Sequence, residues 1–354
     1  MVLFVALFPP EDKQHEGSFQ RIIAVDNEFS REERAYLYVS HRRFFRHREE
    51  EVRPGVILYS CNLLTGLPLI LRLFRQAGTI YLHSLVYTLP VLPLLWGIPR
   101  TARLVLDAHG LVPEEQEMEG GHLKSRLYGF TERLLFRRLD ELVVVTDAMA
   151  GYLLRKYPQA QPRVTTYPIL PGHILQEDAA ITEPDPSQPI CVIYSGNTQA
   201  WQNVPQMLRI IRQNLSPRVH YHLLTGQPAH MHRLLEEAGL AGEASVTVKQ
   251  VSPQELKDYY RDAHYGFVLR DDIPVNRVAC PTKLVEYLYY GIVPVVSSPH
   301  IGDFPELGYE YLAAGEFHAG LPPRKSRRNH LLVKRLLQHR PVLPGMKNKK
   351  QPDG

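Results

Sequence analysis

The stretch that decides the fold runs from Tyr265 to Ser298 and reads YGFVLRDDIPVNRVACPTKLVEYLYYGIVPVVSS. It opens with an apolar segment, passes through a polar loop, and then shows a helical pattern over Pro281–Tyr290 that is followed by Gly291. Pro is favoured in the first helical turn and Gly just past the last one. A second apolar run, Val293–Ser297, comes next. The stretch therefore predicts strand, helix and strand, which is one unit of a parallel α/β sheet.

The same alternation of apolar runs and helix-length stretches extends along the chain in both directions. Predicted strands cover residues 2–8, 35–39, 55–59, 79–83, 103–107, 141–146, 190–195, 220–225, 245–248, 265–269 and 293–297. Stretches such as 64–76 and 123–138 are predicted helices. Because 354 residues exceed what one core usually organises, we expect two Rossmann-like domains with a ligand cleft between them.

A change in amino-acid composition marks the boundary between the two predicted domains. Seven prolines fall between Pro158 and Pro189, and this window has little apolar periodicity, which is typical of a linker. We predict an N-terminal domain over 1–165, a linker over 166–189, a second domain over 190–322 and a basic tail over 323–354.

The charge of the chain is concentrated in that tail. The net charge is +4, yet residues 324–354 hold ten Lys or Arg and one acid, so the remainder has 31 basic and 36 acidic residues and a net charge of −5. A slightly acidic body makes nucleic acid an improbable partner. The tail contains a helical pattern over Asn329–Arg340 with apolar residues on one stripe, which predicts either docking on the body or contact with an anionic membrane.

Other segments carry weaker signals. The mixture of cations and aromatic residues at Arg42–Arg48 could contact nucleic acid or lipid, but Glu49–Glu51 beside it equally predicts a self-paired surface. Three separated cysteines give no support for a disulfide framework or a zinc site. His220 and His222 share one face of a strand without a third ligand, so we predict no metal site.

The sequence also predicts no organic cofactor and no membrane span. No GxGxxG fingerprint occurs at a strand-to-helix junction, which disfavours NAD and FAD. The apolar run from Leu85 to Ile98 is interrupted by Pro90 and Pro93, which disfavours a transmembrane helix. We expect a cytoplasmic protein, with peripheral attachment to the inner face of the plasma membrane as the role of the tail.

The helix that begins near Pro281 carries the groups expected of a phosphate site. Its N-terminus offers free N–H groups, Lys283 lies in its first turn, and Arg270 ends the preceding strand, which together suit a diphosphate. Glu286 lies one turn beyond Lys283, where a carboxylate can accept both hydroxyl hydrogens of a ribose. Taken singly, Lys283 and Glu286 are more typical of an exposed helix pair, but the combination favours nucleotide binding.

These residues carry a resemblance to a known family. The segment PTKLVEYLYYGIVPVV, residues 281–296, resembles the donor site of glycosyltransferase family 4 and related retaining GT-B enzymes. The resemblance implies that Glu286 binds the ribose of a nucleotide sugar, with Pro281, Thr282 and Leu284 around it. The second Glu of the family motif is replaced here by Val278, as in a subset of members.

The resemblance extends more loosely over residues 1–320. It implies that Ser195, Gly196 and Asn197 form a turn near the donor phosphates and that His109, after a strand, contacts the donor sugar. It places an acceptor loop at the three residues Glu16, Gly17 and Ser18. Glu114, with Glu115 beside it, is the nearest acidic candidate for acceptor contact.

Three functions follow from this reading. The first is transfer of a sugar from a nucleotide-diphosphate donor to a surface polysaccharide, a lipid-linked glycan or a similar acceptor. The family implies retention of anomeric configuration, with His109, Arg270 and Lys283 at the reacting groups and no metal. The second is a nucleotide-sugar epimerase of the same fold. The third is a non-catalytic binding protein that acts through the basic tail.

Overall fold

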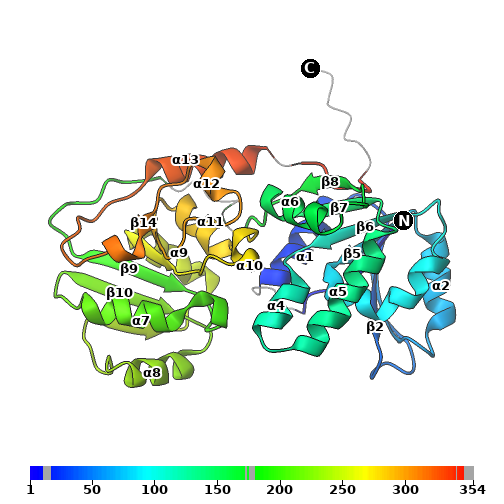
Figure 1. Cartoon of the computed structure of the whole chain (residues 1–354), viewed down its shortest axis with the longest axis horizontal. Helices are drawn as coiled ribbons and strands as arrows, with labels where there is room; N and C mark the ends of the chain where they lie inside the picture. The colour runs from blue at the N-terminus through cyan, green and yellow to red at the C-terminus, as the bar shows by residue number, and fades with distance from the viewer. Residues whose placement is uncertain (11–16, 172–173, 175–179, 340, 347–354) are drawn as a thin grey trace, which may run out of the picture. The chain divides into compact units, whose positions relative to one another are not determined.

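The computed structural model divides the chain into two compact units, Met1–Pro168 with the stretch from Pro341, and Ile169–Arg340. The structure describes residues 1–10, 17–171, 174, 180–339 and 341–346. Each unit is an α/β domain built on its own sheet (Figure 1).

The first unit contains an eight-stranded sheet in the order β3-β4-β2-β1-β5-β6-β7-β8. All neighbouring strands are parallel except β3 and β4. The strands are β1 (Val2–Val5), β2 (Arg34–Ser40), β3 (Arg48–Arg53), β4 (Val56–Asn62), β5 (Thr79–His83), β6 (Arg103–Ala108), β7 (Glu141–Val144) and β8 (Arg163–Thr166). The helices are α1 (Gly17–Glu28), α2 (Leu67–Gln76), α3 (Ser84–Thr88), η2 (Leu89–Gly97), α4 (Val112–Met118), α5 (His122–Phe136) and α6 (Asp147–Lys156).

Burial on both faces explains why the central strands read as continuous apolar runs. Every residue of β1, β5 and β7 is buried, as expected when helices cover a parallel sheet on both sides. An aromatic cluster fills one side of this core. Phe4 stacks on Tyr36 at a ring-centroid distance of 5.0 Å and meets Phe29 edge-on at 5.3 Å.

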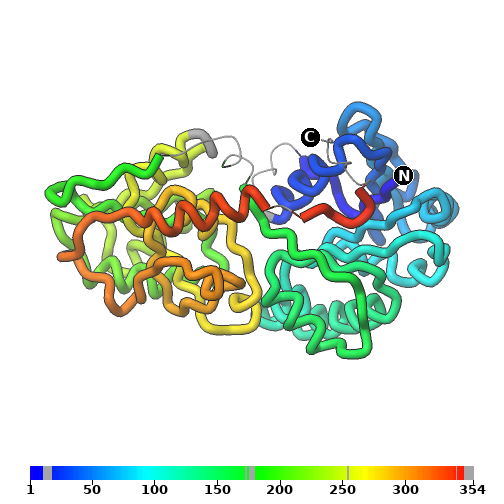
Figure 2. The backbone as a smooth tube through the Cα atoms, turned by 90° about the horizontal axis from the view of Figure 1, so that it is seen from above, coloured from blue at the N-terminus to red at the C-terminus, as the bar shows by residue number. Residues whose placement is uncertain are grey.

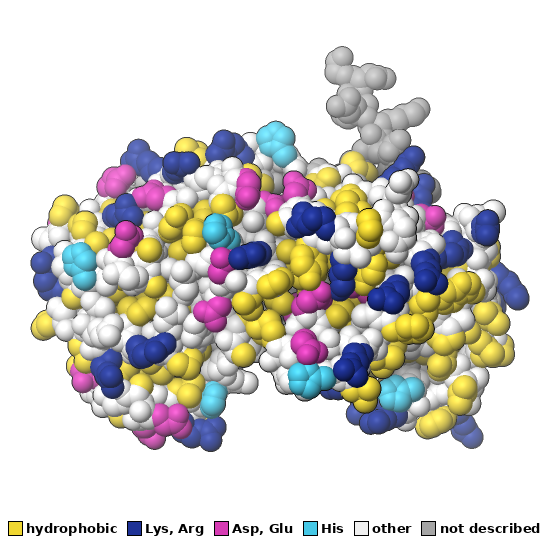
Figure 3. Space-filling view, viewed as in Figure 1, with side chains coloured by type: hydrophobic (Ala, Val, Ile, Leu, Met, Phe, Trp, Pro, Cys, Tyr) yellow, Lys and Arg dark blue, Asp and Glu magenta, His cyan; other side chains and the backbone are white. Residues whose placement is uncertain are grey.

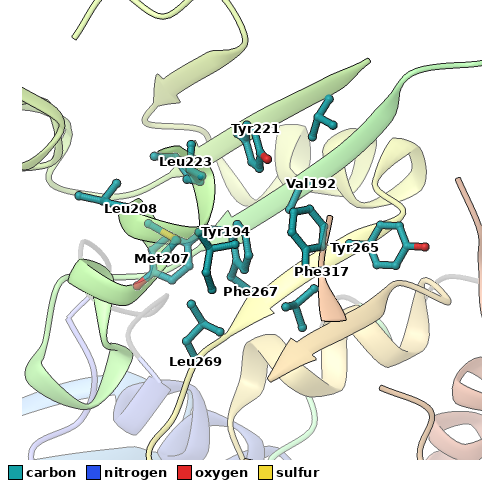
Figure 4. Close-up of a cluster of buried hydrophobic side chains, with 14 of the residues drawn as sticks. Val192, Tyr194, Met207, Leu208, Tyr221, Leu223, Tyr265, Phe267, Leu269 and Phe317 are labelled. Atoms are coloured by element: carbon teal, nitrogen blue, oxygen red, sulfur yellow. The ribbon is translucent and has the colours of Figure 1, made fainter. Parts of the chain in front are cut away.

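The second unit contains a six-stranded, fully parallel sheet in the order β11-β10-β9-β12-β13-β14. The strands are β9 (Ile190–Ser195), β10 (Val219–Leu224), β11 (Val246–Lys249), β12 (Tyr265–Val268), β13 (Val293–Val296) and β14 (Leu312–Ala313). The helices are η4 (Ala200–Gln202), α7 (Val204–Gln213), α8 (Pro228–Glu237), α9 (Pro253–Asp262), α10 (Pro274–Arg277), α11 (Thr282–Tyr289), α12 (Phe304–Leu307), η5 (Ala314–Glu316) and α13 (Arg327–Gln338). Figure 4 shows its core, where Tyr194, Tyr221 and Phe267 project from adjacent strands toward Met207 and Phe317.

The sequence predicted a basic tail over 323–354 whose helix docks on the body or contacts a membrane, and in the structure this helix docks on the second unit. Helix α13 lies along the second unit (Figure 2) and packs on α11, with Leu332 and Val333 buried and Leu331 exposed. The side chain of Ser326 caps its N-terminus by accepting from the Asn329 N–H. After it, Leu343 is buried in the core of the first unit. The apolar stripe is stabilised by burial against the protein, which removes it from water.

Strand β3 and helix α10 are among the elements that were not predicted from the sequence. Strand β3 forms an antiparallel edge whose residues Glu49–Glu51 are exposed, and charged side chains are common on strand edges because they discourage pairing with other chains. The short helix α10 lies within the segment predicted as a polar loop. No helix in the described part of the chain is long and apolar enough to cross a bilayer.

Candidate functional site

Helix α11 forms where the sequence predicts it, with ends shifted by one residue. Pro281 is the N-cap and Thr282 the first helical residue. At the other end, Gly291 adopts a φ of +67° and the Ile292 N–H bonds to the Tyr287 carbonyl at 2.8 Å. This left-handed Gly terminates the helix, as the sequence indicates.

The alternative of an exposed ion pair on α11 is wrong. Lys283 and Glu286 are both 7% exposed, and every residue from Lys283 to Tyr289 is buried. Burying charged groups is costly unless a partner compensates them. The first two turns of α11 therefore hold two ionisable side chains at positions that packing alone would fill with apolar residues.

Lys283 lies between an aromatic ring and a turn. Its Nζ sits 4.2 Å from the ring centroid of Tyr194, a cation–π contact. Gly196 follows β9 with a φ of +152°, and a Cβ atom there would lie 3.5 Å from Lys283 Nζ. Burial, and then the charge of Arg270, lower the pKa of Lys283 well below its usual value, while Glu286 acts in the opposite direction. The predicted turn and the predicted lysine are thus brought together.

Arg270 supplies the second cation of this site. It follows β12 and is 8% exposed, and its Nη1 donates to Asn276 Oδ1 at 3.0 Å. Asn276 in turn donates from Nδ2 to the Asp271 carbonyl at 2.9 Å, which fixes the amide. The unpredicted helix α10 supplies Asn276, whose side chain holds the guanidinium of Arg270.

Glu286 belongs to a chain of hydroxyl groups. Tyr260 on α9 donates to Glu286 Oε2 at 2.7 Å, and its hydroxyl lies 2.8 Å from Ser195 Oγ. The Ser195 N–H donates to the Tyr287 hydroxyl at 2.9 Å. Burial raises the pKa of Glu286 to about 7, against the hydrogen bond from Tyr260 and the charge of Lys283. Ser195 and Glu286 are therefore joined through one tyrosine.

The other predicted donor residues lie around this cluster. Asn197 is exposed, and its carbonyl accepts a hydrogen bond from the Tyr194 hydroxyl. Thr282 is half-buried at the start of α11. Leu284 is fully buried, so its side chain packs in the core and holds the helix.

Three tyrosines that surround these residues were not predicted from the sequence. Tyr194, Tyr260 and Tyr287 come from β9, α9 and α11, and they meet only in the folded unit. One signal was present: Tyr194 directly precedes the predicted turn at Ser195. No such signal marks Tyr260.

In the first unit, His109 follows β6 beside a buried ionic network. Asp107 accepts from Arg21 Nη2 at 2.8 Å and from Arg21 Nε at 3.2 Å, and both side chains have no exposed surface. His109 Nε2 and His83 Nδ1 each lie 3.4 Å from Asp107 Oδ2. Although burial raises the pKa of Asp107, Arg21 and the two histidines lower it well below its usual range. Asp107 is therefore ionised, and its carboxylate lies beside the His109 ring without a hydrogen bond to Nε2.

The same three residues, His83, Asp107 and His109, have ligand atoms within 4.8 Å of one another, which is close enough for a metal ion. Burial lowers the pKa of His83 to about 4, so its ring is neutral near pH 7. However, the guanidinium of Arg21 already occupies both oxygens of Asp107. A fixed positive charge on the carboxylate opposes a second cation there, so this cluster is better described as an ion-paired network.

The predicted acceptor residues are less organised. Glu16 lies outside the described residues, Gly17 begins α1, and Ser18 is exposed. Glu114 on α4 accepts at 2.8 Å from both the Tyr152 hydroxyl and Lys156 Nζ. These bonds tie α4 to α6 and give Glu114 a structural role.

Comparison with known proteins agrees with this architecture. Residues 26–168 match the family model described as Glycosyl transferase 4-like domain. The matched residues lie in the first unit, which is therefore similar to a glycosyltransferase 4-like domain. No curated protein matches the chain.

Solved structures extend the likeness over both units. Sucrose-phosphate synthase from Thermosynechococcus elongatus matches with a TM-score of 0.60 and 13% identity, over 95% of this chain and 89% of that one. HepE of Anabaena in complex with UDP-glucose matches with a TM-score of 0.60 and 12% identity, over 95% and 89%. The E. coli trehalose-6-phosphate protein bound with UDP-2-fluoro glucose matches with a TM-score of 0.61 and 12% identity, over 95% and 90%. At this identity the likeness shows the fold, which is GT-B with two Rossmann-like domains, and it confirms the predicted fold class.

Proposed function

We propose that this glycosyltransferase 4-like chain moves a sugar from a nucleotide-diphosphate sugar to an acceptor alcohol, and that the second unit binds the donor. The observation that carries this proposal is the burial of Arg270 and Lys283 at the start of α11, with Glu286 one turn further on. Burial, and then the charge of Arg270, lower the pKa of Lys283, and a diphosphate would place negative charge beside both cations. The carboxylate of Glu286, one helical turn beyond Lys283, suits the ribose hydroxyls of the same ligand.

Each group then has a role in the transfer. Arg270, Lys283 and the N-terminus of α11 stabilise the charge that develops on the departing diphosphate. The turn at Ser195 and Gly196 lets the backbone approach the phosphates. We further propose that His109 contacts the donor sugar, because it follows β6 beside the ionised Asp107 and the family resemblance implies this contact.

The finer features of the reaction are also proposals. Family resemblance supports retention of anomeric configuration. The two cations supply the charge that a divalent metal otherwise provides, which supports a metal-independent reaction without a further cofactor. The titles of two solved neighbours name UDP-sugars, which supports a nucleotide sugar as the donor class. A polysaccharide or lipid-linked glycan is the proposed acceptor, and the cytoplasm the proposed location.

Thermal stabilisation by a panel of nucleotide sugars tests this function. A ligand that binds the native state raises the melting temperature according to its concentration and affinity. We expect one class of nucleotide-diphosphate sugar to stabilise the chain, and the same sugar to appear on an acceptor in a turnover assay. A chain that no UDP-, GDP-, ADP- or dTDP-sugar stabilises would contradict the proposal.

A further inference from the structure

The outer face of α5 has a composition opposite to that of an ordinary surface helix. Leu123, Leu127 and Phe130 are 82%, 46% and 56% exposed. Their spacing of four and three residues places them on one stripe of the helix. The inner face is already filled, because Leu135 and Phe136 are buried on the opposite side. The outer stripe is therefore an apolar surface additional to the core of the unit.

Basic residues border this stripe. Lys124 lies on one side of it, and Arg126, Arg133 and Arg137 lie on the other, and all four are exposed. The single acid of α5, Glu132, faces inward, where it accepts from Lys156 and the Tyr157 hydroxyl. The outer face of α5 thus combines apolar and cationic side chains without a carboxylate of its own helix.

Helix η2 beside α5 has the same character, whereas α4, which also packs on α5, carries exposed Glu117 and Glu119 at its C-terminal end. Helix η2 packs against α5, and Arg138 at the end of α5 donates to the Ile98 carbonyl at 3.1 Å. Trp96 on η2 is 58% exposed. From Val52 to Leu106 the sequence has five arginines and no Asp or Glu. Figure 3 shows hydrophobic and basic side chains intermixed over this unit, on the side of α2 and η2.

We infer that the outer face of α5, defined by Leu123, Leu127 and Phe130 with their flanking cations, docks on an anionic lipid bilayer. A surface of apolar side chains interleaved with Lys and Arg binds such a bilayer, because the apolar side chains enter the headgroup region while the cations contact lipid phosphates. A partly exposed Trp beside the stripe suits the same boundary. This surface replaces the basic tail as the membrane contact, since α13 buries Leu332 and Val333 against the second unit.

Sedimentation of the full-length protein with vesicles tests this inference without nucleotide or acceptor, so its outcome is independent of the proposed reaction. The chain should bind vesicles of phosphatidylcholine mixed with phosphatidylglycerol, bind phosphatidylcholine alone less, and release as salt is raised. The variant Leu127→Ser/Phe130→Ser should lower the partition coefficient by more than about tenfold. The variant Arg126→Gln/Arg133→Gln should lose the preference for anionic vesicles.

A matched control lies on α13, the helix for which the sequence left docking on the body and membrane contact both open. Leu331 on α13 is 56% exposed, like Phe130, and Leu331→Ser should leave vesicle binding unchanged. Unchanged melting temperatures would show that the variants fold, as expected for exposed positions. Failure of the parent chain to bind either vesicle would overturn the inference, and so would an equal loss in Leu331→Ser. Light scattering that shows a dimer abolished by Leu127→Ser/Phe130→Ser, with vesicle binding intact, would instead assign the face to a second copy of the chain.

Discussion

At Lys283 and Glu286 the demands of stability and of ligand binding oppose each other. Both side chains are buried on α11, and burial shifts the pKa of each toward its neutral form. Apolar residues of similar size would pack there without a desolvation cost. We therefore expect these positions to be maintained for a ligand rather than for folding.

Replacing Lys283 with Met separates the two roles. Lys283→Met removes a buried cation beside Arg270, so the free protein should melt at the same or a higher temperature. The affinity for a nucleoside diphosphate should fall by about 1.5 to 3 kcal/mol, the usual value of a hydrogen bond to a charged group. Thermal melts and calorimetric titration measure the two effects. Lys249→Met, at an exposed lysine of the same unit, should change neither.

The pH dependence of stability tests the burial of Glu286. Burial raises its pKa to about 7 in the folded chain, from an ordinary value of 4.5. The native state thus binds this proton more tightly than the unfolded state does. That contribution is full below about pH 4.5 and is lost as the pH rises through about 7, a span of up to about 3 kcal/mol.

The variant Glu286→Gln lacks this titration. Its free energy of unfolding, measured by denaturant titration, should therefore rise relative to that of the parent chain between about pH 5 and pH 8. Parallel curves for the two proteins over this range would show that Glu286 does not titrate as a buried group.

At the scale of the element, α11 could be predicted because its signals are local. Pro281, Gly291 and the strand-to-helix order are properties of neighbouring residues, and they indicate both the helix and its boundaries. The surroundings of Glu286 could not be predicted in the same way. Tyr260 approaches it from α9, 26 residues away, and this contact depends on how the helices pack on the sheet.

The sheet of the first unit brings together groups that no motif connects. Arg21 on α1 and Asp107 at the end of β6 are separated by 86 residues, yet they form a buried pair. Arg21 also donates to the Tyr167 carbonyl, at the end of the first unit. The sequence indicated His109 through its place after a strand, but it gave no reason to select Arg21.

Breaking this pair should destabilise the first unit. Arg21→Met leaves the Asp107 carboxylate buried without its main partner, which should cost about 3 to 5 kcal/mol in chemical denaturation. Adding Asp107→Asn removes the orphaned charge, so the double variant should recover part of the loss. Equal stabilities for Arg21→Met and the parent chain would show that the pair contributes little.

At the scale of the whole molecule, the alternation of strands and helices was sufficient to predict two Rossmann-like domains. The path of the chain after Lys325 was not predictable, because composition alone cannot distinguish a solvated basic tail from a docked helix. The burial of Leu332 and Val333 shows that the apolar stripe determines where this helix packs, whereas the charges that dominate the composition lie around the stripe.

The reaction of the whole chain should not depend on a divalent metal. If Arg270 and Lys283 carry the diphosphate charge, sugar transfer should proceed at the same rate in EDTA as in Mg²⁺ or Mn²⁺. A transfer assay with the donor found by thermal stabilisation measures this. Loss of activity in EDTA that is restored by added Mn²⁺ would show that the two cations are insufficient.

Calorimetric titration tests the donor site most directly. The nucleoside diphosphate of the donor that stabilises the chain is titrated into the parent chain and into Glu286→Ala. Loss of a charged hydrogen-bond acceptor for the ribose should weaken binding by about 1 to 3 kcal/mol, with the fold retained. Equal affinities in the two proteins would contradict the assignment of α11 as the nucleotide-binding helix.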